Sequence, residues 1–571
     1  MPYRSPVNDF QFLLDHVVGF RAVQDTEKFA EATDETVSAI LTEAGKLADE
    51  VIAPLQRVGD TDGAVLENGV VRASPGFREG YQAMAEGGWI GMSGDPEHGG
   101  MGLPFTLTAS LNDMIGGACL AIGLNPILSQ GQIEALEAHA SDEMKDLYLP
   151  KLTSGEWTGT MNLTEPQAGS DVGALTTKAV PNGDGTYAIT GQKIYISWGD
   201  HDMADNVCHL VLARLPDGAP GTKGISLFMV PKLIPDADGK PGQANDLRVV
   251  SLEEKMGLHG SPTCVMSFEG ATGWLVGEEH AGMAAMFTMM NNARLNVGVQ
   301  GVGVAEGAYQ HALAYALDRK QGRTPLENGT GTIIDFADVR RMLVQMRAET
   351  YAARAIALAC STAIDMAGAT GDKAWKARAA FLTPIAKSYG TDTGIKVAEL
   401  GVQVHGGMGY VEETGAAQYY RDVRVTSIYE GTNGIQAMDL VARKMMDGGD
   451  TAFRILDEIE TDAEAARESY GKLAEAVWSA AETLREATEW LVEQDLQDRF
   501  AGAVPFQSAF ARVLGAHYHL RSAVAEGGDG PRRALAAFYI ERLLPEHAAL
   551  LEQARAGADG LYALAVEDLA V

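Results

Sequence analysis

The chain has few cysteines, and they show no pairing pattern. Its 571 residues include only Cys119, Cys208, Cys264 and Cys360, which are widely scattered and form no CxxC or metal-like spacing. This pattern predicts reduced core residues in a cytoplasmic protein rather than a disulfide framework. No cluster of histidine, cysteine and carboxylate residues has metal-ligand spacing either, so we expect no metal.

Basic residues are also scarce. The chain has 45 Lys and Arg against 77 Asp and Glu, which gives a formal net charge of −32. General binding to nucleic acid or to an anionic membrane needs a basic surface, so neither partner is expected. The longest weakly charged run, Met101 to Glu134, is interrupted by Asp113 and Pro126 and predicts buried helices rather than a membrane span. Residues 1–20 lack the layout of a signal peptide.

Several nucleotide and hydrolase motifs are missing. Gly298-x-x-Gly301-x-Gly303 and Gly406-x-x-Gly409 resemble nucleotide loops only loosely, and neither follows a predicted strand. No Rossmann unit is therefore predicted. A serine hydrolase is unsupported because no nucleophile elbow is present. His405, alone in a glycine-rich loop, is more often a structural residue than a ligand.

What is present is a long soluble chain whose character changes along its length. Hydrophobic residues make up 46% and charged residues 21%, which fits three or four globular domains. The pattern predicts a multidomain α+β protein in this order: an N-terminal extension (1–35), an N-terminal α-helical domain (36–156), a middle β-barrel or β-sandwich domain (157–280), a C-terminal α-helical bundle (281–447) and an appended α-helical domain (448–571).

The predicted elements follow from periodicity and turn residues. Strands are expected at Trp157–Thr164, Thr186–Ile196, Val207–Leu215, Gly224–Val230, Leu247–Leu252 and Thr263–Phe268. Long helices are expected at Met286–Leu317, Phe336–Met366, Lys373–Leu400, Ile435–Met446, Thr451–Glu493 and Pro505–Val571. An irregular polar insertion, Gly322 to Gly331, separates the first two of these helices.

Two segments of the β region could bind a flat heterocycle. The run from Thr164 to Asp171 follows the first predicted strand, and its small residues would let a ligand approach backbone N–H groups. Tyr195 and Ser197 are two positions apart on a strand, so an aromatic ring and a hydroxyl share one face. Taken singly, an ordinary turn and a core aromatic are the more common explanations.

A third segment, Ser427 to Gln436, places Glu430 after an apolar-aromatic pair and before a glycine. A carboxylate held between apolar residues tends to have a raised pKa and can act as a base. Taken alone, an acidic residue that opens a helix is more often a capping or dipole device.

Taken together, these motifs resemble those of the acyl-CoA dehydrogenase family, in order from about residue 33 to 446. The resemblance rests on Tyr148-Leu149-Pro150-Lys151-Leu152 with Gly155-Glu156, Thr164-Glu165-Pro166 to Ser170-Asp171, Gly191-Gln192-Lys193 with Ile196-Ser197, Glu254-Lys255-Met256-Gly257, Gln403 with Gly406-Gly407 and Gly409-Tyr410, Arg421-Asp422, and Ile428-Tyr429-Glu430-Gly431-Thr432. The start Tyr3-Arg4-Ser5-Pro6 and the helical tail look like the 3-methylmercaptopropionyl-CoA dehydrogenase subgroup.

This resemblance implies a helical–β–helical fold that binds FAD, partly across a subunit interface. The implied cofactor-binding residues are Leu163, Thr164, Ser170, Tyr195, Ile196, Ser197, Arg319, Gln321, Gln403, Gly406, Gly407, Thr432 and Asn433. Tyr195 replaces the Trp of many relatives and keeps an aromatic face. The insertion after Gly322 removes an aromatic that usually contacts the adenine.

The same resemblance implies the substrate site and the base. Ser170, Asn291, Arg294 and Gly431 would contact the CoA thioester, with Asn291 standing where some relatives have Asp. Some relatives carry the catalytic Glu at the position of Ala293, which here has no carboxylate. Glu430 is therefore the implied base, which would take the α-proton while the β-hydrogen leaves to the flavin.

The implied reaction converts an acyl-CoA, in particular 3-(methylthio)propionyl-CoA or another short- or medium-chain acyl-CoA, to a trans-2-enoyl-CoA. Electron-transfer flavoprotein would accept the electrons, and the protein would form a homodimer or homotetramer. An acyl-CoA oxidase that uses O2 is the first alternative. A non-catalytic relative that binds nucleic acid is an alternative of another class, and the acidic balance and Glu430 oppose it.

Overall fold

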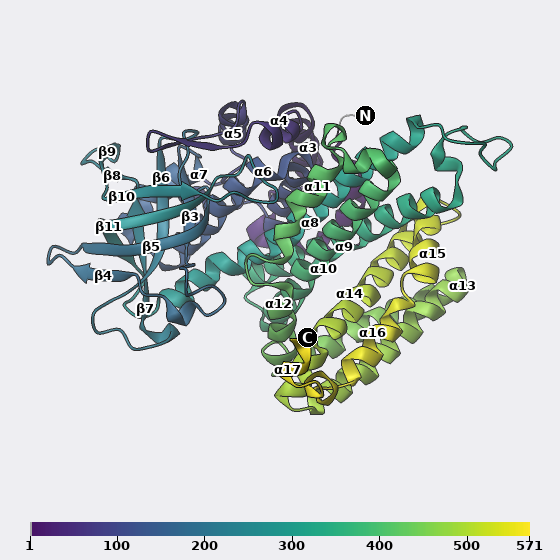
Figure 1. Ribbon diagram of the computed structural model, residues 1–571. Coiled ribbons are helices and arrows are strands. Elements are labelled where there is room, and N and C mark those ends of the chain that lie inside the picture. Colours follow the sequence, from purple (N-terminus) through teal and green to yellow (C-terminus); the bar gives the residue numbers. More distant parts are fainter. Residues whose placement is uncertain (1–2, 571) are drawn as a thin grey trace. The chain divides into compact units, whose positions relative to one another are not determined.

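The structure, a computed structural model, describes residues 3–570, which form two compact units (Figure 1). One unit runs from Glu43 to Ala293. The other combines the chain up to Thr42 with everything from Arg294 onwards. The division falls within α3 (Asp34–Lys46) and α8 (Gly282–Asp318), so each of these helices contributes to both units.

The unit from Glu43 to Ala293 begins with helices. They are α4 (Leu55–Thr61), α5 (Phe77–Glu86), α6 (Phe105–His139) and α7 (Asp142–Thr153), with a hairpin of β1 (Val65–Glu67) and β2 (Val70–Arg72) before α5. By length and composition α6 could cross a membrane, and so could α9 (Ala337–Thr370), but 100% and 78% of their most apolar windows are buried. Both are core helices, and the four cysteines are likewise buried and form no disulfide among the described residues.

The middle of this unit is a seven-stranded sheet. Its strands are β3 (Trp157–Asn162), β4 (Lys178–Pro181), β5 (Tyr187–Ser197), β6 (Asn206–Arg214), β7 (Ile225–Pro231), β10 (Leu247–Leu252) and β11 (Thr263–Val276); β8 (Leu233–Pro235) and β9 (Pro241–Ala244) pair separately. Since β7 pairs with both β6 and β11, the order β11-β5-β4-β6-β7 closes on itself. The sheet is therefore a small barrel, filled by side chains such as Ile189, Phe228 and Phe268.

The second unit contains a bundle of long helices: α8, α9, α10 (Lys373–His405), α11 (Ala416–Val423) and α12 (Asn433–Ala442). Glycines let α8 and α10 cross closely, since a Cβ added at Gly298 would lie 2.5 Å from the Ala386 carbonyl oxygen and one at Gly390 2.4 Å from that of Gly298. The loosely nucleotide-like Gly298-x-x-Gly301 run is thus a helix-packing motif. The close crossing places the first turns of α8 that belong to this unit beside Lys387 of α10.

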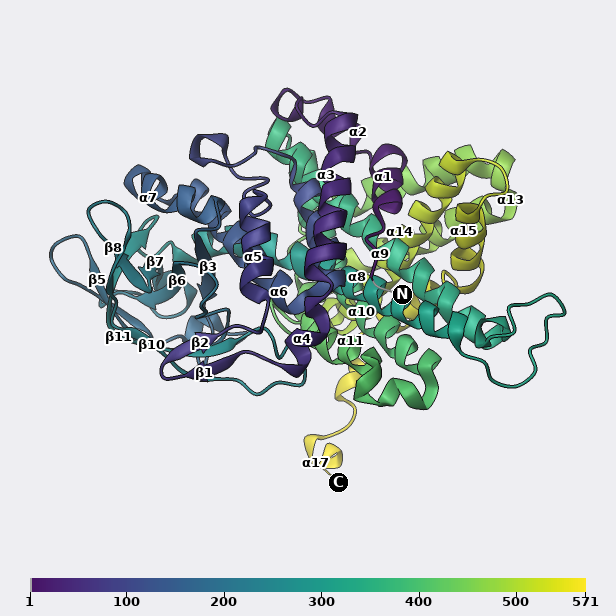
Figure 2. The same ribbon diagram turned by 90° about the horizontal axis from the view of Figure 1, so that it is seen from above.

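The same unit holds the appended helices α13 (Asp450–Glu493), α14 (Leu496–Glu526), α15 (Pro531–Arg542), α16 (Glu546–Arg555) and α17 (Val566–Leu569) (Figure 1). It also holds the N-terminal helices α1 (Val7–His16) and α2 (Arg21–Gln24), with α1 alongside α9 and α14 (Figure 2). Asp9 of α1 pairs with Arg347 of α9 at 3.4 Å and with Arg532 of α15 at 3.0 Å. The N-terminal extension therefore joins the bundle to the appended helices.

Candidate functional site

Glu430 lies on a strained turn between a 3-10 helix (Arg424–Ser427) and α12. Its φ is +54° and that of the following Gly431 is +82°, so two consecutive residues are left-handed. A left-handed conformation is unfavourable for a residue with a side chain and persists where surrounding contacts impose it. Here Tyr429 anchors the turn, because its hydroxyl donates to Gln300 Oε1 at 2.5 Å.

The Glu430 carboxylate has no hydrogen-bond partner among the described residues, but two cations lie near it. Burial raises the pKa of Glu430, while the charges of Arg294 and Lys387 oppose that rise. Arg294, one turn before the α8–α10 crossing, has a buried Nε with no hydrogen-bond partner within residues 3–570. The turn therefore presents a carboxylate disposed to hold or accept a proton, beside a guanidinium with free hydrogen-bonding capacity.

The side chains of Thr432 and Asn433 both form hydrogen bonds within the fold. The Thr432 hydroxyl caps α12 by accepting from the Ile435 N–H at 3.3 Å. The Asn433 amide donates to Thr391 Oγ1 at 2.9 Å and Asp392 Oδ1 at 2.7 Å, and its oxygen accepts from Lys387 at 2.8 Å. The Asn433 side chain thus faces α10, and only its backbone is left for a ligand.

In the β-containing unit, the two predicted heterocycle segments lie side by side. The Ile194 N–H donates to the Thr164 carbonyl at 2.9 Å. At this point β5 carries a bulge, because its pairing with β11 shifts register between Lys193 and Ile196. Tyr195 sits on the bulge with φ +60° and is 62% exposed, while Ser197 is partly exposed.

A buried ion pair fixes these segments. Lys193 Nζ donates to Glu165 Oε1 and to the Leu163 carbonyl, both at 2.9 Å. Glu165 also accepts from the backbone N–H and hydroxyl groups of Thr176 and Thr177. Burial alone would raise the pKa of Glu165, but the Lys193 charge and these bonds outweigh it and lower that pKa to about 2.

The loop held by this pair is open to solvent. Ser170 is exposed, and a Cβ added at Gly169 would meet no atom within 4 Å. Leu163 and Thr164, directly after β3, are partly exposed. The loop therefore offers backbone and hydroxyl groups with free space above them.

Another predicted cluster lies at the shared end of α8 and α10. Arg319, Gln321 and Gln403 are exposed, and a Cβ on Gly406 or Gly407 would meet nothing within 4 Å. His405 is buried and stacks on Tyr315 with ring centroids 4.3 Å apart. His405 is therefore a packing residue that holds the two helix ends together.

The predicted site residues thus form coherent groups within each unit. Asn291 is exposed on α8, and Ala293 is buried there. Lys387, Gln436 and the Glu165–Lys193 pair were not predicted as site residues from the sequence. A lysine inside the apolar run from Phe381 to Tyr389 was the available signal for Lys387.

Comparison with known proteins identifies the domains of the chain. The chain matches the descriptions "Acyl-CoA dehydrogenase, N-terminal domain" over residues 34–156, "middle domain" over 160–271 and "C-terminal domain" over 280–446. Residues 455–565 match "Acetyl-CoA dehydrogenase C-terminal like".

Individual relatives extend over most of the chain. The 3-methylmercaptopropionyl-CoA dehydrogenase of Ruegeria pomeroyi is 46% identical over 89% of this chain and 88% of its own length. The broad-specificity linear acyl-CoA dehydrogenase FadE5 of Mycobacterium tuberculosis is 36% identical over 78% of this chain and 75% of its own.

Among solved structures, Caenorhabditis elegans ACDH-11 in complex with C11-CoA superposes with a TM-score of 0.79 at 20% identity, covering 95% of this chain and 92% of its own. At that identity the likeness shows the fold alone. The domain matches and the relatives together show more. The chain belongs to the acyl-CoA dehydrogenase family of flavoproteins and is an oxidoreductase that dehydrogenates acyl-CoA.

Proposed function

We propose that Glu430 is the base that removes the α-proton of the acyl-CoA thioester. The observation that carries this proposal is the unpartnered carboxylate on a left-handed turn, with a pKa raised by burial. A base with a raised pKa matches the proton it must take better than an ordinary carboxylate does. The backbone N–H of Glu430 would stabilise charge on the thioester oxygen, as preorganised donors do.

We propose that FAD is the cofactor. The open glycines at 169, 406 and 407 and the exposed side chains of Arg319, Gln321 and Gln403 support a dinucleotide, because phosphates favour arginine and close backbone approach. Bound FAD would supply the hydride acceptor. Leu163, Thr164, Ser170, Tyr195, Ile196 and Ser197 would face the ring system, with Thr432 and the Asn433 backbone.

We propose 3-(methylthio)propionyl-CoA as the substrate, which the likeness to the Ruegeria pomeroyi protein supports. The alternative of a longer or broader acyl chain rests on FadE5. Ser170, Asn291, Arg294 and Gly431 would bind the thioester, and the unpartnered Arg294 Nε supports such a contact. Electron-transfer flavoprotein as acceptor, a homo-oligomer, a cytoplasmic location and the domain boundaries given above belong to the same proposal.

The base is tested with Glu430→Gln. The variant should keep FAD and acyl-CoA binding but lose nearly all flavin reduction, followed as anaerobic flavin bleaching. Glu413→Gln makes the same charge change at an exposed residue of the same unit and should leave bleaching unchanged. A Glu430→Gln protein that bleaches at the parent rate would show that another group is the base.

The substrate is tested by titrating the parent protein anaerobically with a panel of acyl-CoAs. Methylthiopropionyl-CoA should bleach the flavin fastest. Faster bleaching by a straight-chain acyl-CoA would replace the substrate proposal. Rapid peroxide formation in air without another acceptor would indicate an oxidase instead.

A further inference from the structure

Lys387 of α10 is a buried cation directly beneath the Glu430 turn. Its side chain is fully buried, and Nζ donates to the Gly431 carbonyl at 3.0 Å and to Asn433 Oδ1 at 2.8 Å. No ion pair to Lys387 occurs in the part of the chain that the structure describes. The carboxylates of Asp392 and Glu430 act on it only through their charges. A buried charge held by no direct ion pair is costly, so its retention at this place calls for an explanation.

In the turn above Lys387, the carbonyl groups of Glu430 and Gly431 both accept hydrogen bonds from side chains. Gln436 Nε2 donates to the Glu430 carbonyl at 3.2 Å, while Lys387 holds the Gly431 carbonyl. A Cβ added at Gly431 would lie 2.7 Å from Gln436 Nε2, so the turn closes tightly over these donors. The strained conformation of Glu430 is thus imposed from below by two side chains that reach it from α10 and α12.

Lys387 also acts on the carboxylate through its charge. The groups that face this site are Arg294 on α8, Lys387 and Asp392 on α10, Tyr429 on the turn itself, and Asp439 with Arg443 around α12. Of these, Arg294 and Lys387 favour the ionised form of Glu430. Burial lowers the pKa of Lys387 to about 8, so it remains largely charged at neutral pH.

Resting on the proposed role of Glu430 as the base, we propose that Lys387 is its positioning residue. Its ammonium group holds the Gly431 carbonyl and the Asn433 amide so that Glu430 stays on the left-handed turn. Its positive charge also favours the carboxylate form that accepts the proton. Lys387 does this through Glu430 and touches no reacting atom.

Two substitutions separate the hydrogen bonds of Lys387 from its positive charge. Lys387→Met removes the charge and the donors, whereas Lys387→Arg keeps the charge and alters the donor geometry. For each, the rate of anaerobic flavin reduction is measured against pH at saturating and limiting acyl-CoA. Lys376→Met, at an exposed lysine of the same helix, is the control and should match the parent.

In the parent, reduction should rise with pH through the pKa of Glu430, because only the carboxylate accepts a proton. In Lys387→Met the midpoint should move up by about one pH unit, since a nearby opposite charge shifts a carboxyl pKa by one unit or more. The plateau rate should fall about 10-fold or more with little change in acyl-CoA affinity, because a displaced base loses alignment. Lys387→Arg should keep the parent midpoint and lose plateau rate.

If Lys387→Met does not retain FAD, Lys387→Gln removes the charge but keeps a donor, and the same upward shift of the midpoint is expected. Parent-like midpoints and plateaus in the neutral variants would overturn the inference. Glu430→Gln distinguishes the two levels of proposal. If it abolishes reduction while Lys387→Met and Lys387→Gln behave like the parent, only the positioning role fails; if it reduces normally, the base assignment itself fails.

Discussion

Glu430 and Tyr195 are non-glycine residues held at positive φ, each in a segment that the sequence motifs assign to ligand contact. Each such residue costs about 1 kcal/mol or more, and this strain is characteristic of functional sites. The contacts responsible differ. A bulge in β5 imposes the conformation on Tyr195, whereas hydrogen bonds from Lys387 and Gln436 impose it on the Glu430 turn.

Gly431 provides a direct test of this closed turn. Gly431→Ala places a Cβ 2.7 Å from Gln436 Nε2 at φ +82°, so the variant strains the backbone of the turn and displaces the side chain that holds the Glu430 carbonyl. We expect flavin reduction to fall about 10- to 100-fold. Gly434→Ala, where the added Cβ meets only Thr432 Oγ1 at 3.9 Å, should be neutral or slightly stabilising in α12. Equal rates for the two variants would show that the turn geometry does not control the base.

Glu134 of α6 makes stability depend on pH. Burial raises its pKa to about 7, although its carboxylate accepts from Asn292 Nδ2 at 2.8 Å. The native carboxyl therefore keeps its proton where the unfolded one, with a pKa of about 4.3, has lost it. This contribution to stability is fully present below pH about 4.3 and is lost as pH rises through about 7.

Glu134→Gln should therefore show a smaller fall in Tm between pH 5 and pH 8 than the parent, measured by scanning calorimetry. The glutamine stays neutral and can still accept from Asn292. Glu79→Gln, at an exposed residue of the same unit, should keep the parent's pH dependence. An unchanged pH dependence in Glu134→Gln would contradict the raised pKa.

At the scale of elements, the bulged strand β5 and the loop after β3 are one assembly held by Glu165 and Lys193. Lys193→Met would leave Glu165 buried without its cation, and breaking such a pair costs about 3–5 kcal/mol. We expect the free energy of unfolding to fall by about that amount in urea titrations, with loss of bound flavin. The double variant Glu165→Gln/Lys193→Met should lose less than the sum of the single changes. Strictly additive losses would show that the two residues are not coupled.

Much of the element pattern was predictable from the sequence. Periodicity placed the strands at Val207–Leu215 and Leu247–Leu252 within a residue of β6 and β10. Pro505 was wrong as a helix start, because α14 begins at Leu496 with Asp495 as its cap, and tertiary packing tolerates the proline inside. The short strands β4, β8 and β9 were missed because three or four residues carry too little periodicity.

One feature of the candidate site, a carboxylate with a raised pKa, was predictable from adjacent residues. The raised pKa of Glu430 follows from its apolar setting, which the sequence Ile428-Tyr429-Glu430-Gly431 displays. Lys387 and Lys193 were missed as supporting residues because their partners, Gly431 and Leu163, are far from them along the chain. Such contacts depend on how helices cross and strands pair, which local patterns do not encode.

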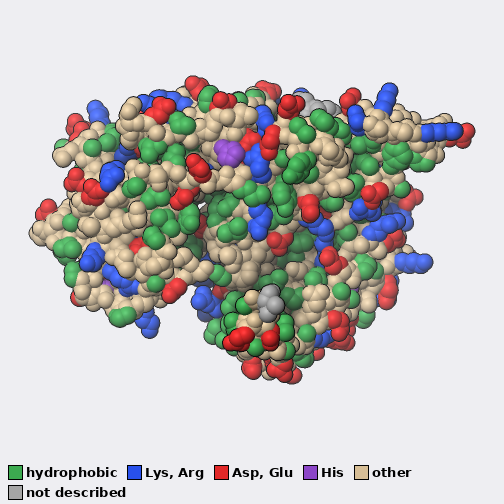
Figure 3. Space-filling view, viewed as in Figure 1, with side chains coloured by type: hydrophobic (Ala, Val, Ile, Leu, Met, Phe, Trp, Pro, Cys, Tyr) green, Lys and Arg blue, Asp and Glu red, His purple; other side chains and the backbone are tan. Residues whose placement is uncertain are grey.

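At the scale of the whole molecule, two features matter: how charge is distributed over the surface and how the appended helices pack on the bundle. Despite the net charge of −32, acidic and basic side chains are interspersed on the face in Figure 3, with no continuous basic surface on that face.

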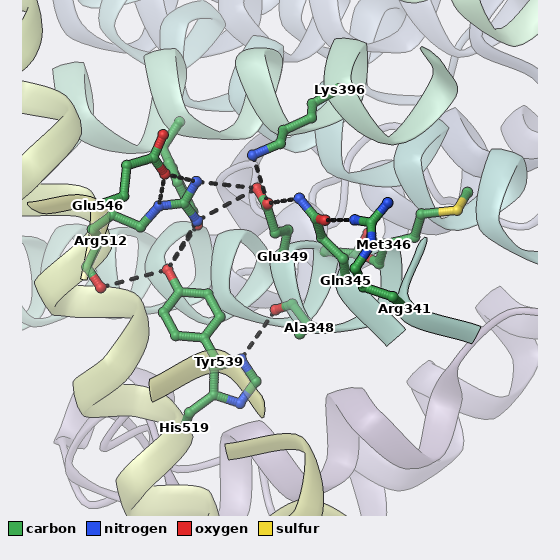
Figure 4. Close-up of polar contacts among 12 residues, drawn as sticks. Arg341, Gln345, Met346, Ala348, Glu349, Lys396, Arg512, His519, Tyr539 and Glu546 are labelled. Carbon is green, nitrogen blue, oxygen red and sulfur yellow. Dashed lines mark hydrogen bonds and ion pairs between the residues drawn. The ribbon is translucent and has the colours of Figure 1, made fainter. Parts of the chain in front are cut away.

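The appended helices contact the bundle through a polar cluster around the buried Glu349 of α9. Glu349 pairs with Lys396 of α10 and with Arg512 of α14, and Arg512 also pairs with Glu546 (Figure 4). The appended helices are therefore part of the same compact unit as the bundle.

Glu349 tests whether that unit unfolds as a whole. Burial alone would raise the pKa of Glu349, but Arg512 and Lys396 outweigh it and lower that pKa, so the carboxylate is ionised at neutral pH. Glu349→Gln leaves two cations facing a neutral amide, and we expect the free energy of unfolding to fall by about 3 kcal/mol. Glu468→Gln, exposed on α13, should change it by less than about 0.5 kcal/mol.

Because α9 belongs to the bundle and α14 to the appended helices, the loss should lower the stability of both together. Hydrogen exchange on Glu349→Gln should show faster opening of α9, α10 and α14 by a common factor. If amides of α13 to α16 alone exchanged faster while those of α9 and α10 kept the parent rates, the appended helices would be an independent module. The buried cluster would then hold two separately folding parts in contact, and truncation after Gly448 should leave a stable bundle.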